Sequence, residues 1–199
     1  MDDLHDVWRE CTPGMDDAAV REVYRRCGTG YLFTWAHADR YRYTKYERVR
    51  PLLRGKTLLD YGTATGCLAL FAARLDGFAV TAADIATPYF RFAQFRFAAY
   101  GGVTALDLES EPVPRGAFAT VLLLDVLEHV VDWRAALDSC LAARAPGGRL
   151  VADVAYDRYA DGALHISDRT GLTPAALAAH IAARGAREVW RDGALAVWE

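Results

Sequence analysis

The regular alternation of short apolar segments and helix-like segments from Lys56 onward constrains this chain most. The strand-like segments are residues 57–59, 78–83, 103–106, 118–124, 149–154, 186–191 and 194–198, and the helix-like segments are residues 66–75, 88–100, 132–144 and 174–184. Such βα alternation implies a parallel sheet with helices on both faces. The Asp192-Gly193 dipeptide predicts that the last two strands form an antiparallel hairpin. We therefore predict an α/β fold: a doubly wound, mostly parallel seven-stranded sheet that ends in an antiparallel hairpin.

The first fifty residues differ in character, because they combine helical patterns over about 2–10, 15–27 and 38–50 with many aromatic side chains. These aromatic residues are Tyr31, Phe33, Trp35, Tyr41, Tyr43 and Tyr46. No repeat, low-complexity tract or linker separates this segment from the remainder. We therefore expect residues 1–50 to form a helical N-terminal lid over the substrate pocket of one domain, whose main part is residues 51–199.

Four of the predicted strands end in an aspartate, namely Asp60, Asp84, Asp107 and Asp125. In open α/β sheets the ligand crevice lies beyond the carboxyl ends of the strands. One aspartate after a strand is ordinary loop composition, but these four meet at one edge. We expect the ligand to bind there.

The first predicted strand leads into a glycine-rich turn, Gly62-Thr63-Ala64-Thr65-Gly66, and then into a helix. Glycine permits positive φ and close approach of a ligand, and a helix N-terminus offers unpaired N–H groups. Asp84 lies 18 residues after Gly66, at a position suited to accept hydrogen bonds from ribose hydroxyls. A dinucleotide-binding oxidoreductase is the alternative, but its G-x-G-x-x-G spacing is absent from this turn.

Four motifs in this order resemble the class I S-adenosylmethionine-dependent methyltransferases, in particular the small-molecule type of ubiquinone biosynthesis. They are the turn at residues 58–66, Leu106-Asp107-Leu108, the segment Leu124-Asp125-Val126-Leu127-Glu128-His129-Val130 followed by Asp132, and Ala145-Pro146-Gly147-Gly148-Arg149-Leu150. The resemblance covers roughly residues 50–199 and implies a Rossmann-like methyltransferase fold.

The same resemblance implies S-adenosyl-L-methionine as the cofactor. The expected cofactor-binding residues are Asp60, Gly62, Ala64, Gly66, Asp84, Ile85, Asp107, Leu108 and Asp125. Structural roles remain as alternatives for three of the acids: Asp60 in the glycine loop, Asp107 in a turn and Asp125 as a cap. Ala64 departs from the family pattern, since it replaces the middle glycine, and a positive φ there would cost about 1–2 kcal/mol.

The catalytic candidates are His129, His165 and Tyr43. A histidine after the fourth strand can act as a general base for a hydroxyl or amine. The alternative for His129 and its neighbour Glu128 is a structural role that ties two loops together. A metal site built from Asp125, Glu128 and His129 is conceivable, but we expect no metal.

Aromatic residues have two further interpretations. Tyr41, Tyr43 and Tyr46 can close over the sulfonium of the cofactor, since aromatic faces attract cations, or can simply pack the lid. In the helix at 88–100 the aromatic residues cover more than one face. Core packing explains most of them, and a homodimer contact or an acceptor surface is the alternative.

Composition excludes several classes of protein. A net charge of -3 argues against a nucleic-acid partner, and no apolar stretch approaches the roughly 20 residues of a membrane span. The four cysteines are widely spaced, which argues against a disulfide framework and favours a cytoplasmic location.

We therefore predict an S-adenosylmethionine-dependent methyltransferase that acts on oxygen or nitrogen of a small metabolite in specialised biosynthesis. Two alternatives remain. One is a cyclase or lyase that converts the cofactor itself to a small cyclic amino acid and methylthioadenosine. The other is a non-catalytic cofactor-binding protein.

Overall fold

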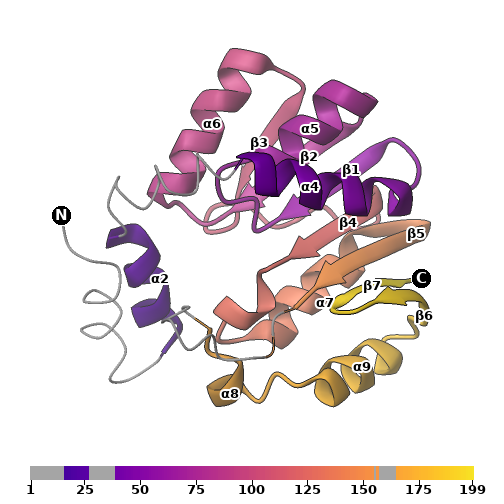
Figure 1. Cartoon of the computed structure of the whole chain (residues 1–199). Coiled ribbons are helices and arrows are strands. Elements are labelled where there is room, and N and C mark those ends of the chain that lie inside the picture. The colour runs from indigo at the N-terminus through magenta and orange to yellow at the C-terminus, as the bar shows by residue number, and fades with distance from the viewer. Residues whose placement is uncertain (1–15, 27–38, 155, 157–164) are drawn as a thin grey trace.

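The computed structural model describes residues 16–26, 39–154, 156 and 165–199, and these form a seven-stranded sheet in the order β3-β2-β1-β4-β5-β7-β6 (Figure 1). The strands are β1 (Thr57–Tyr61), β2 (Ala79–Asp84), β3 (Val103–Asp107), β4 (Phe118–Leu124), β5 (Arg144–Asp153), β6 (Glu188–Asp192) and β7 (Leu195–Trp198). Strands β1 to β5 pair in parallel, whereas β7 is antiparallel to both β5 and β6. The predicted fold class is confirmed.

Helices cover both faces of the sheet, as Figure 1 shows. They are α4 (Asp39–Val49), α5 (Cys67–Asp76) and α6 (Pro88–Tyr100) on one face, and α7 (Trp133–Ala143) and α9 (Pro174–Ala183) on the other. Each face has its own apolar core. One core centres on Phe90 and Phe97, and the other on the fully buried Trp133.

Two differences from the sequence expectation concern turns, and the other boundaries differ by two residues or fewer. Strand β5 begins at Arg144, before the Pro-Gly-Gly turn, because the chain passes through a register shift against β4 between Phe118 and Thr120. Gly147 takes a φ of 72°, which lets the strand continue through this irregularity. The terminal hairpin forms as expected, but its loop is Gly193-Ala194, since Asp192 pairs with Leu195.

Two N-terminal helices are described, α2 (Asp17–Arg26) and α4. Helix α4 is fixed to α5, because the buried Tyr46 donates its hydroxyl hydrogen bond to Asp76, which also pairs with Arg50 of the short 3-10 helix η1 (Arg50–Leu52). The predicted helix at 2–10 and the aromatic residues Tyr31, Phe33 and Trp35 lie outside the described residues.

Helix α6 buries Tyr89, Phe90 and Phe97 and leaves Phe95 and Tyr100 on the surface, 69% and 58% exposed. Core packing therefore accounts for part of its aromatic content, and the homodimer contact stays a prediction.

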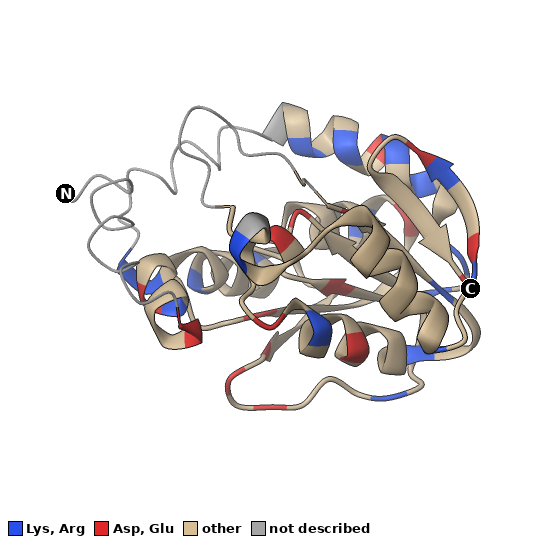
Figure 2. Cartoon of the chain, turned by 90° about the horizontal axis from the view of Figure 1, so that it is seen from below, with Lys and Arg blue, Asp and Glu red and all other residues tan. Residues whose placement is uncertain are grey.

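None of the described helices is long and apolar enough to cross a membrane. Figure 2 shows that acidic and basic residues are both distributed over the helices, strands and loops.

Candidate functional site

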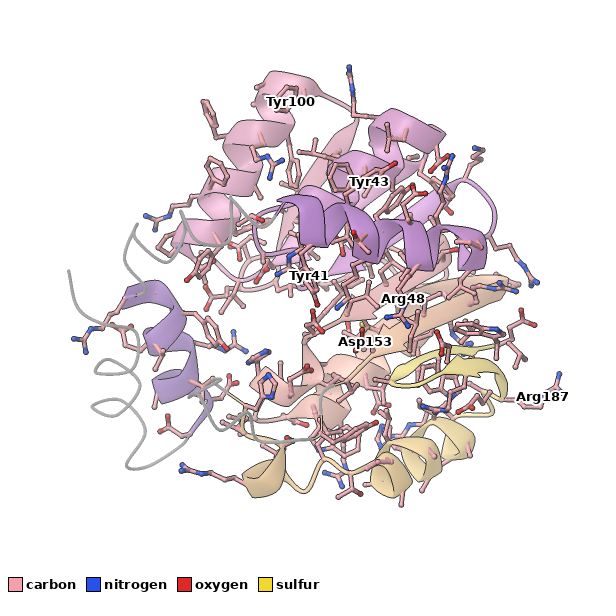
Figure 3. All side chains as sticks on the ribbon, in the orientation of Figure 1. Tyr41, Tyr43, Arg48, Tyr100, Asp153 and Arg187 are labelled. Atoms are coloured by element: carbon pink, nitrogen blue, oxygen red, sulfur yellow. The ribbon has the colours of Figure 1, made fainter. Side chains whose placement is uncertain are left out.

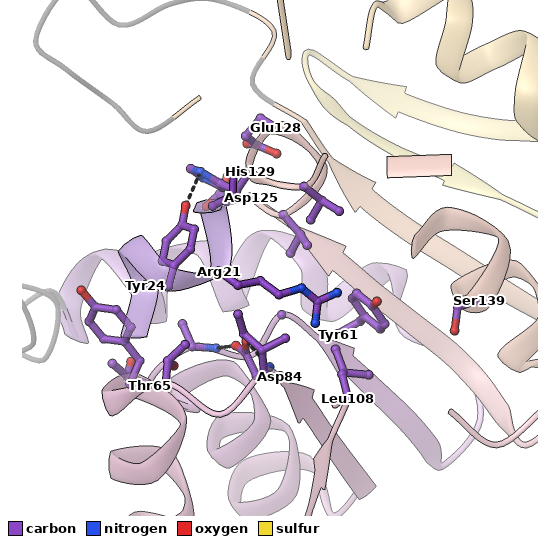
Figure 4. A pocket seen from close by; sticks show the side chains of 18 of the residues that line it. Arg21, Tyr24, Tyr61, Thr65, Asp84, Leu108, Asp125, Glu128, His129 and Ser139 are labelled. Atoms are coloured by element: carbon purple, nitrogen blue, oxygen red, sulfur yellow. Dashed lines mark hydrogen bonds between the residues drawn. The ribbon is translucent and has the colours of Figure 1, made fainter. Parts of the chain in front are cut away.

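A cavity of about 600 Å³ opens at the carboxyl ends of the parallel strands, where the four aspartates were expected to meet. The glycine loop after β1, the ends of β2 and β4 and the segment after β3 form its walls, and α2 and α4 contribute the remaining side chains (Figure 4). Of the nine predicted cofactor-binding residues, six line this cavity. These are Gly62, Ala64, Asp84, Ile85, Leu108 and Asp125.

The glycine turn is shaped by three residues with positive φ. Gly62 has φ 76°, and a Cβ there would lie 2.4 Å from Val126. Gly66 also has φ 76°, and a Cβ would lie 2.5 Å from the ring of Phe97, so this glycine permits close packing of α5 on α6. Ala64 adopts φ 49°, which lies in the left-handed region. The cost of about 1–2 kcal/mol that was expected for alanine at a positive φ therefore applies.

Asp84 connects this turn to the end of β2. Its Oδ2 accepts the Ala64 N–H at 2.7 Å, and its Oδ1 accepts the Ile85 N–H at 2.8 Å. Burial raises the pKa of the Asp84 carboxyl to about 6, against the opposing effect of these two hydrogen bonds. The carboxylate is therefore oriented toward the cavity and ready to accept hydrogen bonds from a ligand.

Asp125, at the end of β4, has φ 53° and lies within a cluster of charges. The Lys45 ammonium from α4 donates to Asp125 and lies 3.2 Å from the carboxylate of Asp153, while only 8% of the Lys45 side chain is exposed. Arg42, one turn earlier in α4, lines the cavity with its guanidinium 3.9 Å from Asp125. These contacts attach α4 to the ends of β4 and β5 and place a cation in the cavity.

Helix α2 closes the opposite side of the cavity. Arg21 and Arg25 both bond to Glu109, which follows β3 and also accepts the Ala86 N–H at 3.3 Å. Figure 4 shows the Arg21 side chain extending along the cavity toward Tyr61. Helix α2 is thus attached by ion pairs to the loop that follows β3, which in turn bonds to the loop after β2.

Two histidines meet at one end of the cavity. His129, in the 3-10 helix η2 (Leu127–His129), lies edge-on to His165 with ring centroids 4.8 Å apart. The backbone N–H of Ile166 donates to the Glu128 carbonyl at 2.8 Å, which brings the segment before α8 (Ser167–Thr170) to η2. One ligating atom from each of Glu128, His129 and His165 lies within 4.8 Å of the others. The two predicted histidines are therefore brought together.

Other predicted residues lie elsewhere. Tyr43 is not among the cavity-lining residues: its ring stacks edge-on against Phe71 of α5, so the structure does not support a catalytic position for it. Figure 3 shows Tyr43 toward α5 and Tyr41 on the cavity side of α4. Tyr46 is fully buried, which leaves Tyr41 as the member of this tyrosine group that lines the cavity.

Three predicted cofactor ligands support the loops instead of lining the cavity. Asp60 is buried and accepts the Thr63 hydroxyl at 2.6 Å, and burial raises the pKa of its carboxyl. Asp107 caps the turn after β3 by accepting the Glu109 N–H at 2.9 Å. Gly66 takes the packing role described above. For Asp60 and Asp107 the geometry matches the structural alternatives.

Sequence reasoning missed Arg21 and Tyr24 of α2 and Arg42 of α4. The hydroxyl of Tyr24 lies 2.9 Å from Nδ1 of His129. None of these residues belongs to a motif, and only tertiary packing brings them to the cavity. The density of arginine and tyrosine in the first fifty residues was the one available signal.

Comparison with known proteins gives a family match to a model described as a methyltransferase domain, over residues 34–182. The ubiquinone biosynthesis O-methyltransferase of Caulobacter vibrioides is 34% identical over 136 residues, which cover 65% of this chain and 52% of that relative. The demethylmenaquinone methyltransferase of Thermus thermophilus is 38% identical over 101 residues, covering 48% and 46%. The chain thus spans about half the length of these curated relatives.

Solved structures agree with the fold. The [4+2]-cyclase SpnF superposes with a TM-score of 0.59 at 26% identity, covering 77% of this chain and 58% of that one. A SAM-dependent methyltransferase from Aquifex aeolicus has a TM-score of 0.59 at 13% identity, covering 92% and 96%.

Proposed function

The chain belongs to the methyltransferase domain family, and we propose that it transfers a methyl group from S-adenosylmethionine to oxygen or nitrogen of a small molecule. The observation that carries the proposal is the arrangement of one cavity. Asp84 and the glycine turn lie along its wall, and His129 and His165 meet at one end. This arrangement supports a nucleoside site and a proton acceptor in the same cavity.

The residues present fit the cofactor. Asp84 would accept hydrogen bonds from the ribose hydroxyls, since both of its oxygens are oriented by backbone N–H groups. Leu108 and Ile85 offer apolar contact to the adenine, and Arg42 offers positive charge to the amino-acid carboxylate. When bound, S-adenosylmethionine supplies a methyl group on a sulfonium, which needs alignment and desolvation more than activation.

The acceptor end of the cavity provides a base. His129 and His165 line the cavity together with the apolar Val20 and Val130. A neutral imidazole near working pH can take the proton from a hydroxyl or amine as that group attacks the methyl carbon. The apolar neighbours exclude water from the reacting atoms, which favours transfer to the acceptor over hydrolysis.

The acceptor class follows from the size of the site and from the relatives. A cavity of about 600 Å³ has room for a cofactor and a small molecule. The two curated relatives are named for ubiquinone and menaquinone methylation. We therefore propose a small acceptor with a hydroxyl or amino group, with ring compounds as the first to test.

Mass spectrometry of the protein incubated with S-adenosylmethionine, with and without a panel of hydroxylated and amino-substituted ring compounds, tests this function. We expect S-adenosylhomocysteine and a methylated product only when an acceptor is present. Methylthioadenosine formed without an acceptor would contradict methyl transfer and support the cofactor-cleaving alternative. Because SpnF is described as a cyclase, the methylated product itself must be identified.

A further inference from the structure

Tyr24 of α2 places its hydroxyl group beside a histidine of the cavity. Its oxygen lies 2.9 Å from Nδ1 of His129, and the two rings stand at 89° with their centroids 6.1 Å apart (Figure 4). Tyr24 belongs to α2, which precedes the family match at residues 34–182. The contact therefore joins the N-terminal helix α2 to a histidine of the matched domain.

The position of this hydroxyl is set by a supported helix. Val20 and Val23 of α2 are buried, at 3% and 0% exposure. Arg25 of the same helix bonds to Glu109 on the far side of the cavity mouth. The Tyr24 side chain therefore approaches His129 from a scaffold that is anchored on both its apolar and its charged face.

A neutral imidazole carries its proton on one nitrogen and accepts a proton at the other, and the hydrogen bond at one nitrogen decides which form is present. We infer that Tyr24 is a positioning residue that holds His129 in the tautomer protonated at Nδ1. In this tautomer Nδ1–H donates to the Tyr24 hydroxyl oxygen, and Nε2 is the nitrogen that can take a proton. The inference rests on the proposed function, in which His129 is the base.

The proton transfer balances within this arrangement. The acceptor O–H or N–H bond breaks and its proton passes to Nε2 of His129. The electron pair of the acceptor atom forms the bond to the methyl carbon, and the carbon–sulfur electrons remain on sulfur. His129 is then an imidazolium whose Nδ1–H still donates to Tyr24. Because a charged donor makes the stronger hydrogen bond, Tyr24 also stabilises the protonated base.

Other titratable groups share the cavity with His129. Glu128 and His165 lie beside its ring, and the remaining charged side chains of the lining are Asp17, Arg21, Arg42, Asp84, Glu111 and Asp125. Tyr24→Phe removes only the hydroxyl and leaves these groups in place. The variant therefore isolates the contribution of the Nδ1 hydrogen bond from the charges around it.

Nitrogen NMR of the ¹⁵N-histidine-labelled full chain tests the inference without any acceptor, with resonances assigned by His129→Gln and His165→Gln. We expect the Nδ1-protonated tautomer of His129 in the unmodified chain. In Tyr24→Phe we expect a mixture of the two tautomers, because Nδ1–H loses its hydrogen-bond acceptor. An Nε2-protonated His129 in the unmodified chain, or unchanged spectra in Tyr24→Phe, would overturn the inference.

Two variants control for looser packing of the lid. Arg25→Ala weakens the attachment of α2 to Glu109 without removing the Tyr24 hydroxyl. Tyr100→Phe removes a hydroxyl from an exposed side chain at the end of α6 that does not line the cavity. Both should keep the tautomer of the unmodified chain. If Arg25→Ala changed it as much as Tyr24→Phe does, the effect would belong to the helix as a whole and the inference would fail.

Kinetics with a methylated acceptor give the second readout. In Tyr24→Phe we expect kcat to fall roughly tenfold, because less of His129 is in the form that can take the proton. An unchanged kcat would refute the positioning role. Failure of the proposed function would look different, since no acceptor would then give a methylated product with the unmodified chain, while the NMR result could still stand.

Discussion

Replacement of Asp84 by asparagine tests the nucleoside site with the smallest change of shape. Each carboxylate oxygen of Asp84 accepts one backbone hydrogen bond, at 2.7 and 2.8 Å, and keeps capacity for a ribose hydroxyl. Asparagine keeps one acceptor oxygen but replaces the other with a donor and removes the charge. The substitution therefore acts on both ribose contacts, and it also removes one backbone hydrogen bond, because the amide nitrogen must face the N–H of either Ala64 or Ile85.

The expected loss follows from the strength of these contacts. Hydrogen bonds to a charged group contribute about 1.5–3 kcal/mol each, and the amide retains part of one. A loss of about 2–4 kcal/mol raises the Kd for S-adenosylmethionine roughly 30- to 700-fold. Calorimetric titration at pH 7.5 measures this directly. Asp192→Asn is the matched control, since Asp192 pairs with Arg48 on the surface at 3.0 Å, and its Kd should stay unchanged.

The pH dependence of the Kd for S-adenosylmethionine provides a second test of the role of Asp84. Burial raises the pKa of Asp84 to about 6, so the carboxyl gains a proton as the pH falls below that value. Binding prefers the ionised form, so the Kd of the unmodified chain should rise up to about tenfold per pH unit below 6, whereas Asp84→Asn should respond little. In the absence of ligand, the folded chain holds this proton more tightly than the unfolded chain does. The contribution of Asp84 to the free energy of unfolding is therefore largest at low pH and is lost as the pH rises from about 4 to 6. A Kd for Asp84→Asn within threefold of the unmodified chain would refute the ribose role.

Three further predictions concern stability, measured by urea unfolding. Ala64→Gly should raise the free energy of unfolding by about 0.5–1 kcal/mol, because it relieves the φ of 49°; a decrease would show that this backbone is not strained. Gly66→Ala should cost at least about 2 kcal/mol more than Gly77→Ala, because both have positive φ but only Gly66 faces a ring at 2.5 Å; equal costs would contradict the packing role of Gly66. Lys45→Met should cost roughly 2–3 kcal/mol, since it leaves Asp125 without its buried cationic partner; an unchanged midpoint would mean that solvent already screens this pair.

Local signals predicted most of the sheet. Short apolar runs bounded by glycine or aspartate mark β1 to β4, and Thr173 caps α9 through its side chain as its sequence position suggests. The start of β5 was missed, because Pro146-Gly147-Gly148 is typical of a break. The structure instead accommodates these residues as an irregularity against β4, which depends on the partner strand.

The residues of the candidate site fall into the same two groups: those that a local motif identifies and those that depend on tertiary packing. Asp84 and Gly62 belong to a motif whose spacing alone places them at the sheet edge, and both line the cavity. Tyr43 was predicted near the cofactor from its position before β1, but it does not line the cavity. The direction in which it points depends on the packing of α4, and its ring lies against Phe71 of α5. Tyr24 could not be found from the sequence, since its hydrogen bond joins residues 105 positions apart.

A crystal structure of the chain with S-adenosylhomocysteine tests the central claim most directly. The account predicts density in the cavity after β1, β2 and β4, with the ribose hydroxyls on Asp84, the carboxylate near Arg42 and the sulfur facing His129. Density with the nucleoside away from Asp84, or a saturated crystal whose cavity remains without ligand, would contradict the assignment of this cavity to the cofactor.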